Sequence, residues 1–285
     1  MKGIGSCSGI RNSGIVKLLI LALLTSLLIT GCSMLGQKQK TPGQKPGTNQ
    51  ADKGPAADQP KTEKEYYIGL DAPVEGLKEW VDRYKSYDVV LIQKLGKYRV
   101  LLISMGEKFS PGYDVKINKV KKEPGIWEVE VVLTQPREED YSGKSVYPFE
   151  VVSIIDDGKP VEVFKKDDNT AVKVSVVEIP AGKKLGVSKN FIVFTPYEGE
   201  TIANPVLVKG KGRIFEGSFR LTLEDGHNQL AKKFMMTDNG APAWGNFVVD
   251  LAYEKPTNPS GHLILSWDSP ENGQLIEELL LPVKF

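Results

Sequence analysis

Cysteine and histidine are both scarce in this sequence of 285 residues, which contains two of each. The histidines, His227 and His262, have no second histidine at zinc-site spacing, and the sequence has no H-E-x-x-H motif, G-x-S-x-G elbow or P-loop. The acid pair Asp156-Asp157 lacks the spacing of a calcium-binding EF-hand loop. We therefore expect no catalytic residue, no metal site and no cofactor. A site dispersed along the sequence stays open, because its parts need to meet only in space.

A hydrophobic run long enough to span a membrane is also missing. Residues 18–30 form an apolar run of thirteen residues, whereas a membrane-spanning helix needs roughly 20. The segment before this run carries Lys2, Arg11 and Lys17 and no acid. A basic start followed by a short apolar run and small residues is typical of a secretory signal peptide.

The small residues after the apolar run end in Cys32, and the resulting ITGC sequence resembles the bacterial lipobox. The resemblance implies that residues 1–31 are a lipoprotein signal peptide and that the Cys32 sulfur carries a lipid anchor at the outer face of the cell membrane. Cys7 would be removed, so the mature chain would have no cysteine pair for a disulfide or a thiolate metal site. The alternatives are a transmembrane anchor, which the short run disfavours, and a catalytic thiol, which the tail after Cys32 disfavours.

Residues 32–64 contain this cysteine and a tail rich in Gln, Lys, Pro, Gly and Asp. Such a tail has too little to bury to offset the entropy of ordering, so we expect a disordered linker. A coil of this length would reach roughly 30 Å. Without residues 1–31 the chain has 34 basic against 36 acidic residues. This balance argues against a nucleic-acid partner, which would need a concentrated basic face.

Residues 65–165 are expected to form a small α+β domain. Within residues 73–87, apolar residues at helical spacing predict one amphipathic helix whose buried stripe is Leu77, Trp80, Val81 and Tyr84. Apolar and alternating runs predict strands at residues 88–93, 98–104, 113–120, 126–133 and 146–154. The first two of these runs are apolar on both faces, as in strands that are covered on two sides.

Residues 98–155 resemble the PrcB C-terminal domain of bacterial envelope lipoproteins. The similarity rests on the LISMG sequence that ends at Gly106, the loop 106–113 and the YPF sequence that begins at Tyr147. It implies a noncatalytic domain of a lipoprotein linked to surface protease complexes. In the loop, Phe109 and Tyr113 form either a small exposed recognition surface or a cap over the core, and we favour the cap.

Residues 170–285 are expected to form an immunoglobulin-like β-sandwich, because alternating apolar runs with breakers every eight to twelve residues predict seven short strands. Residues 190–284 resemble the immunoglobulin-like domain of bacterial spore germination proteins, through the GKGRIFEG sequence from Gly210 and the SPENG sequence from Ser269. The resemblance implies a binding or scaffolding module in the envelope of a spore-forming bacterium. A further strand at residues 171–178 lies at the junction, and its sequence does not assign it to either domain.

Three residues of the second domain are candidates for a binding surface. Arg213 and Glu216 stand three apart, as an ion pair of a hairpin or as a spot that recognises a partner, and we favour the ion pair. Trp244 follows a loop-like stretch, and its sequence fits a core position and a platform for glycan rings equally well. Trp267 alternates with apolar neighbours, so we expect it in the core.

These expectations describe a mainly β protein with one helix, made of a signal peptide, a disordered linker, a small α+β domain and an immunoglobulin-like sandwich. The predicted function is that of a noncatalytic, membrane-anchored envelope lipoprotein that binds another envelope protein, with a link to sporulation, germination or a surface protease complex. The alternatives are a peptidoglycan-binding module and a hydrolase with a dispersed site. The candidate binding residues are Phe109, Tyr113, Arg213, Glu216 and Trp244, and the lipid attachment site is Cys32.

Overall fold

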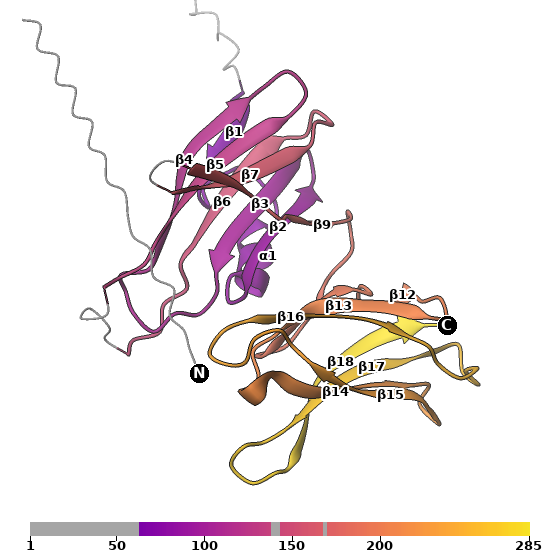
Figure 1. Ribbon diagram of the computed structural model, residues 1–285. Helices are drawn as coiled ribbons and strands as arrows, with labels where there is room; N and C mark the ends of the chain where they lie inside the picture. Colours follow the sequence, from indigo (N-terminus) through magenta and orange to yellow (C-terminus); the bar gives the residue numbers. More distant parts are fainter. Residues whose placement is uncertain (1–62, 138–142, 168–169) are drawn as a thin grey trace, which may run out of the picture. The chain divides into compact units, whose positions relative to one another are not determined.

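The computed structural model describes residues 63–137, 143–167 and 170–285, all of which belong to one compact unit. The signal peptide expected at residues 1–31, the lipid site Cys32 and nearly all of the linker at residues 32–64 lie outside the described residues. Figure 1 shows a helix and two sheets in the N-terminal part of this unit, followed by two further sheets in its C-terminal part. The expected mainly β architecture with a single helix is confirmed.

The first sheet of the N-terminal part has five strands in the order β1-β6-β3-β2-β9. Strand β9 runs parallel to β2, and the other neighbours are antiparallel. Helix α1 covers one face of this sheet, since its apolar stripe shares a core with residues of β2 and β3. The elements are β1 (Tyr66–Ile68), α1 (Leu77–Tyr84), β2 (Asp88–Leu95), β3 (Tyr98–Met105), β6 (Phe149–Ile155) and β9 (Val177–Ile179).

Helix α1 is shorter at its start than the sequence pattern predicts. It begins at Leu77, after Gly76, whose φ of 73° lies in the left-handed region and cannot continue a helix backwards. Pro73 therefore precedes the helix instead of occupying its first turn. The predicted buried stripe is confirmed, because all four of its residues are buried.

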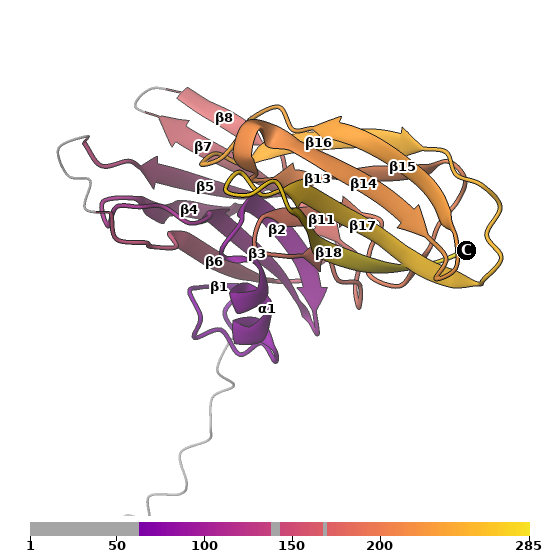
Figure 2. The same ribbon diagram turned by 90° about the horizontal axis from the view of Figure 1, so that it is seen from below.

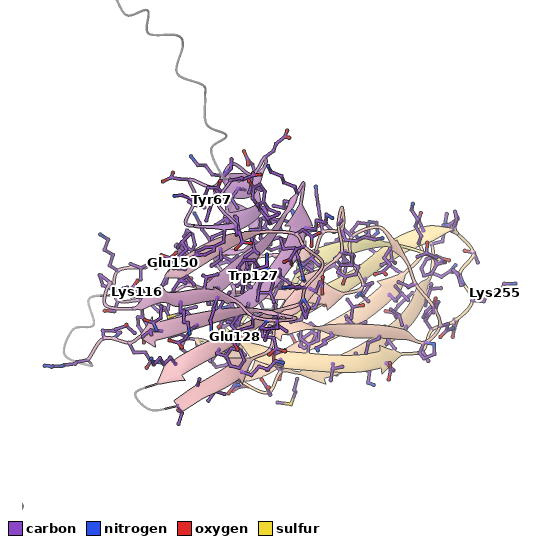
Figure 3. The ribbon with its side chains drawn as sticks, turned by 90° about the horizontal axis from the view of Figure 1, so that it is seen from above. Tyr67, Lys116, Trp127, Glu128, Glu150 and Lys255 are labelled. Carbon is purple, nitrogen blue, oxygen red and sulfur yellow. The ribbon has the colours of Figure 1, made fainter. Side chains whose placement is uncertain are left out.

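The second sheet of the N-terminal part has four strands in the order β4-β5-β7-β8. Its apolar face packs on the face of the first sheet that α1 leaves free, as the shared core of Ile103, Val129 and Val152 records. Strands β2 and β3 are thus covered on both sides, which accounts for their apolar residues on both faces. In Figure 3, Trp127 lies inside this part, whereas Lys116 projects from it. The strands are β4 (Asp114–Lys122), β5 (Trp127–Thr134), β7 (Val161–Asp167) and β8 (Thr170–Val174).

The single junction strand predicted at residues 171–178 is in fact two strands in two sheets. Strand β8 pairs with β7 in the second sheet, and β9 pairs with β2 in the first sheet. The chain therefore crosses from one sheet to the other at Ser175 and Val176, beyond the expected domain boundary near residues 165–170. Alternation alone does not reveal such a crossing, because the apolar residues continue through it.

The C-terminal part is a sandwich of two sheets, ordered β10-β11-β13-β16 and β12-β18-β17-β14-β15 (Figure 2). Their facing side chains form one core, which includes Phe191, Phe219 and Phe247 in successive ring contacts. The seven predicted strands are confirmed, and β10 and β12 add two short ones. The strands are β10 (Gly186–Val187), β11 (Phe191–Thr195), β12 (Glu200–Thr201), β13 (Val206–Gly212), β14 (Ser218–Glu224), β15 (Gln229–Met236), β16 (Gly245–Leu251), β17 (Ser260–Asp268) and β18 (Leu275–Lys284).

A β-bulge between β17 and β18 lies beside Trp267, which is partly buried and packs against the sandwich core, as the alternation of its strand predicts. Leu265 pairs with Leu279 and Ser266 with Glu277, so Glu278 is an extra residue in β18. Ser266 is buried next to this bulge, and Trp267 is partly buried at the margin of the core. The indole N–H of Trp267 donates to the Glu278 carboxylate at 2.7 Å.

The N-terminal part and the sandwich share an apolar cluster, which we call the interdomain core. Leu185, Ile192, Phe194 and Trp244 of the sandwich pack there with α1 and the first sheet. Strand β11 is therefore buried on both faces, with Phe191 and Val193 in the sandwich core and Ile192 and Phe194 in the interdomain core.

Polar contacts border the interdomain core. Tyr87 donates its hydroxyl to the Ser188 carbonyl at 2.7 Å, and Arg83 donates to the Leu185 carbonyl at 2.9 Å. Arg83 also forms an ion pair with Glu198. These contacts help to fix the orientation of the sandwich relative to α1 and the first sheet.

Candidate binding site

A groove of about 440 Å³ lies where the loop 106–113 of the N-terminal part meets loops of the sandwich. Phe109 and Phe215 line it and are 45% and 54% exposed. Trp267, Pro242 and Pro270 add further ring surface, while Lys189, Asn190, Glu107, Arg213 and Ala241 complete the lining. The groove thus offers aromatic and proline surface to solvent and has charged groups at its edge.

Arg213 fixes one wall of the groove. Its side chain is only 11% exposed, and its Nη2 atom lies 3.0 Å from Glu107 Oε2 in the N-terminal part. Its guanidinium group also lies 5.3 Å from the centre of the Trp244 ring. Arg213 therefore joins the loop that carries Phe109 to the interdomain core.

Glu107 is the acidic partner in this wall. Burial opposes its charge, but hydrogen bonds from Ser145 and Arg213 outweigh burial and hold the pKa of the Glu107 carboxyl below its ordinary value. The carboxylate is thus stabilised in its charged form opposite Arg213.

Trp244 is a buried residue and does not offer a platform for a sugar ring. It is 8% exposed, and the Tyr87 ring meets it edge-on at 5.3 Å between centres. Within the part of the chain that the structure describes, its indole N–H has no hydrogen-bond partner. The glycan-stacking role that the sequence left open for Trp244 is wrong, because Arg213 and Tyr87 occupy its surroundings.

The ion pair expected between Arg213 and Glu216 is also wrong, since Arg213 pairs with Glu107. Glu216 has a φ of 55°, which is uncommon outside glycine, in the short 3-10 turn Phe215–Gly217. It is exposed and does not line the groove, whereas its neighbour Phe215 does.

The two aromatic residues of the loop 106–113 have separate surroundings. Phe109 lines the groove, whereas Tyr113 is half-buried and packs against the core between the two N-terminal sheets. The Lys108 ammonium group lies 5.6 Å from the Tyr113 ring centre. Each of the two interpretations of the loop therefore holds for one residue. Phe109 is exposed in the groove, and Tyr113 covers the core.

Sequence reasoning missed Phe215, Pro242 and Pro270 as groove residues. Phe215 stands beside the candidate Glu216, and all four residues before Trp244 are glycine, alanine or proline, which indicates a loop. The sequence around these residues does not indicate that their loops lie next to Phe109 in the folded chain.

The histidines do not assemble a hydrolase site. His262 Nδ1 lies 2.8 Å from Glu224 Oε1, and His227 Nδ1 contacts Asn258 Nδ2 at 2.5 Å. Neither contact involves a serine. In residues 63–137, 143–167 and 170–285, no cluster of three or more metal-ligating acids, histidines or cysteines is present. Among these same residues, no helix has the length and apolar character needed to cross a bilayer.

Two family matches cover the parts that build the groove. Residues 99–154 match the PrcB C-terminal family, and residues 191–274 match the immunoglobulin-like domain of bacterial spore germination. The chain carries these two regions in that order. Neither family is catalytic, which is consistent with a noncatalytic module. No curated protein and no solved structure matches the chain significantly.

The groove combines residues of both matched regions. Glu107 and Phe109 lie within the PrcB C-terminal match, and Arg213, Phe215 and Trp267 lie within the immunoglobulin-like match. In this chain the groove therefore depends on both matched regions.

Proposed function

We propose that this protein is a noncatalytic, lipid-anchored binding module of the bacterial envelope, which holds a segment of another envelope protein in the groove. The observation that carries the proposal is the pairing of exposed Phe109 and Phe215 from two different regions across one groove. Aromatic side chains and arginine are the residue types that dominate the energetics of protein interfaces.

The groove suits a protein partner better than a small substrate. Its rings supply apolar contact area, and Lys189 and Asn190 at its edge supply polar contacts, which is the arrangement of an interface core and its rim. Arg213 and Glu107 already neutralise each other, so they order the wall without demanding a charged ligand.

Attachment through Cys32 would place the module outside the cytoplasm. The lipobox-like sequence supports this anchor, and the polar stretch after Cys32 would let the folded part reach roughly 30 Å from the membrane. A role in germination is supported by the description of the immunoglobulin-like family, and the link to a surface protease complex rests on the resemblance to PrcB lipoproteins alone. A deletion strain with unchanged spore yield and germination kinetics would remove the link to germination.

Site-specific photocrosslinking in the native envelope tests the groove. A photoreactive phenylalanine analogue at position 215 should crosslink one defined envelope protein, and the same analogue at position 248 is the control. Val248 is similarly exposed, at 64%, and lies on the outer face of β16. Equal labelling from both positions would contradict the proposal.

Peptidoglycan binding is the competing function. Trp244 cannot serve as its ring-stacking residue, because this side chain is buried. Purified peptidoglycan should retain the wild-type protein no better than the Phe215→Ala variant. Retention of the wild type alone would favour the glycan-binding alternative over a protein partner.

A further inference from the structure

Strand β15 forms an outer edge of the larger sandwich sheet, where β14 is its neighbour. Two of its side chains, Phe234 and Met236, are 72% and 68% exposed. They are the most exposed large hydrophobic residues in the described part of the chain. An apolar edge strand of this kind readily pairs with a strand of another chain.

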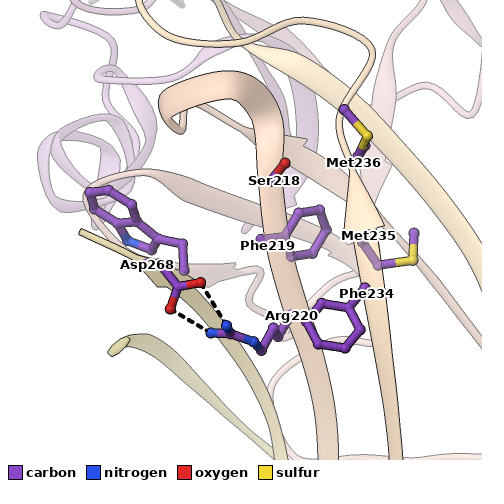
Figure 4. A pocket seen from close by; sticks show the side chains of 8 residues that line it. Ser218, Phe219, Arg220, Phe234, Met235, Met236 and Asp268 are labelled. Atoms are coloured by element: carbon purple, nitrogen blue, oxygen red, sulfur yellow. Dashed lines mark hydrogen bonds and ion pairs between the residues drawn. The ribbon is translucent and has the colours of Figure 1, made fainter. Parts of the chain in front are cut away.

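A hollow of about 380 Å³ borders these two side chains. Figure 4 shows Arg220 between the Phe234 ring and Asp268, whose two carboxylate oxygens accept hydrogen bonds at 2.8 and 2.6 Å. The guanidinium group lies 5.4 Å from the Phe234 ring centre. Trp267 completes one side of the hollow. The surface beside the edge is therefore held in place before any partner arrives.

The backbone of β15 presents free hydrogen-bonding groups at this edge. Thr237 N–H donates to the Gly217 carbonyl at 3.0 Å, so the alternation of an antiparallel ladder turns the backbone groups of Met235 and Lys233 toward β14 as well. The N–H and C=O groups of the intervening residues point away from β14. The Leu230 carbonyl agrees with this alternation, because it accepts a bond from Glu254 N–H outside the sheet.

Three residues therefore offer an unpaired edge, namely Lys232, Phe234 and Met236. In the described part of the chain, no backbone group outside β14 pairs with them. An added strand would bond to the N–H and C=O groups of every second residue, which are the groups that these three residues offer.

The charge along the edge is uneven. Lys232 and Lys233 are exposed at its first half and form no ion pair with the described residues, whereas its second half is apolar. By contrast, edge strand β4 carries four lysines along its length and a bulge between Ile117 and Lys119. Lysines and bulges protect an edge from pairing, so β4 is guarded where the second half of β15 is not.

We propose that β15 binds an extended segment of a second protein as an added strand, with acidic side chains opposite Lys232 and Lys233 and apolar side chains against Phe234 and Met236. A second copy of this chain fits less well. Pairing β15 with itself about its middle brings the lysines of the two copies together, and pairing about Phe234 sets Lys232 against Met236, so neither arrangement gives the lysines an acidic partner. The uncompensated positive charge therefore selects an acidic partner.

This surface is distinct from the groove, although Trp267 lines both. The test uses the purified full-length chain and a synthetic ten-residue peptide with two consecutive glutamates, one for the face of each lysine, followed by alternating valine and threonine. Binding should slow hydrogen exchange at the amides of Lys232, Phe234 and Met236. The amides of Lys233 and Met235 should change little, because β14 already protects them.

Variants at Phe234 separate the backbone from the side chain. Phe234→Pro removes the outward N–H, and we expect it to weaken peptide binding at least about tenfold relative to Phe234→Ala, which keeps that N–H. The double variant Lys232→Glu, Lys233→Glu should also lose binding, and Phe215→Ala in the groove should keep it.

Three outcomes would overturn the proposal. One is the absence of peptide binding at millimolar concentration, and another is equal binding by Phe234→Pro and Phe234→Ala. The third is a concentration-dependent dimer in sedimentation that Phe234→Pro abolishes, because this would assign the edge to a second copy. Loss of binding in Phe215→Ala with no effect of Phe234→Pro would assign the peptide to the groove instead.

Discussion

The interdomain core and the groove are built from the same kinds of residue but differ in what covers them. Ile192 and Leu185 in the core are completely buried, whereas Phe109 and Phe215 in the groove are about half exposed. Arg213 lies between the two regions, since it contacts Trp244 of the core and lines the groove. The comparison teaches that the core determines how the two parts meet, which leaves the groove aromatics free for a partner.

The largest effect is expected inside the interdomain core. Ile192→Ala should lower the free energy of unfolding by about 2–4 kcal/mol, because it leaves a cavity between β11 and α1. Leu207→Ala is the matched control on the outer face of β13, where the side chain is 47% exposed, and it should change stability by under about 0.5 kcal/mol. Urea denaturation measures both values. An Ile192→Ala protein as stable as its control would show that the two parts are not held by this core.

A smaller effect is expected at the polar support beneath β11. The Glu278 carboxylate accepts hydrogen bonds from Ser188 Oγ, Asn190 N–H and Trp267 Nε1. In Glu278→Gln the side-chain NH2 group replaces one accepting oxygen, so one of these donors loses its acceptor. The change should lower the free energy of unfolding, measured by urea denaturation, by about 1–3 kcal/mol. Glu277→Gln changes the exposed neighbour in the same strand and should be nearly neutral. Equal stabilities of the two variants would contradict a structural role for the bulge.

The wall between core and groove should respond to pH. Since the pKa of Glu107 is lowered, its charged form contributes stability above the ordinary glutamate pKa of about 4.3, and this contribution is lost as pH falls through the lower, folded value. Glu107→Gln should therefore cost about 1 kcal/mol at pH 7, and the difference from wild type should close in acid. Glu216→Gln is the control and should match the stability of wild type at pH 7. A difference between Glu107→Gln and wild type that does not shrink as pH falls, measured by urea denaturation, would mean that charge is not the cause.

These regions also differ in how far the sequence predicts them. The stripe of α1 and the alternation in β14 and β16 depend on local periodicity, and each was predicted correctly because one face of each element is buried. Strand β11 was predicted as a strand of the sandwich, but its burial on both faces was not predicted. Its partner could not be predicted, because α1 lies about one hundred residues earlier in the chain.

The failures have a common physical cause. The bulge at Glu278 in β18 was not predicted, because the extra residue leaves the alternation of its partner strand β17 unchanged. Arg213 was expected to pair with its near neighbour Glu216, yet it pairs with the partly buried carboxylate of Glu107 from the N-terminal part. Bulges and contacts between distant segments are set by tertiary packing, which local patterns do not encode.

The smallest effect on stability, with a large effect on binding, is expected in the groove itself. Phe215→Ala should change the free energy of unfolding by under about 0.5 kcal/mol, because the ring is 54% exposed and belongs to none of the apolar cores. The same change should abolish the crosslink that a photoreactive phenylalanine analogue at position 109, on the same groove, forms with the envelope partner, because an exposed aromatic anchor contributes only when a partner buries it. Urea denaturation and crosslinking of one preparation measure the two effects together. If Phe215→Ala instead destabilised the fold as much as Ile192→Ala, the ring would be part of the interdomain core, and the distinction between a closed core and an open groove would fail.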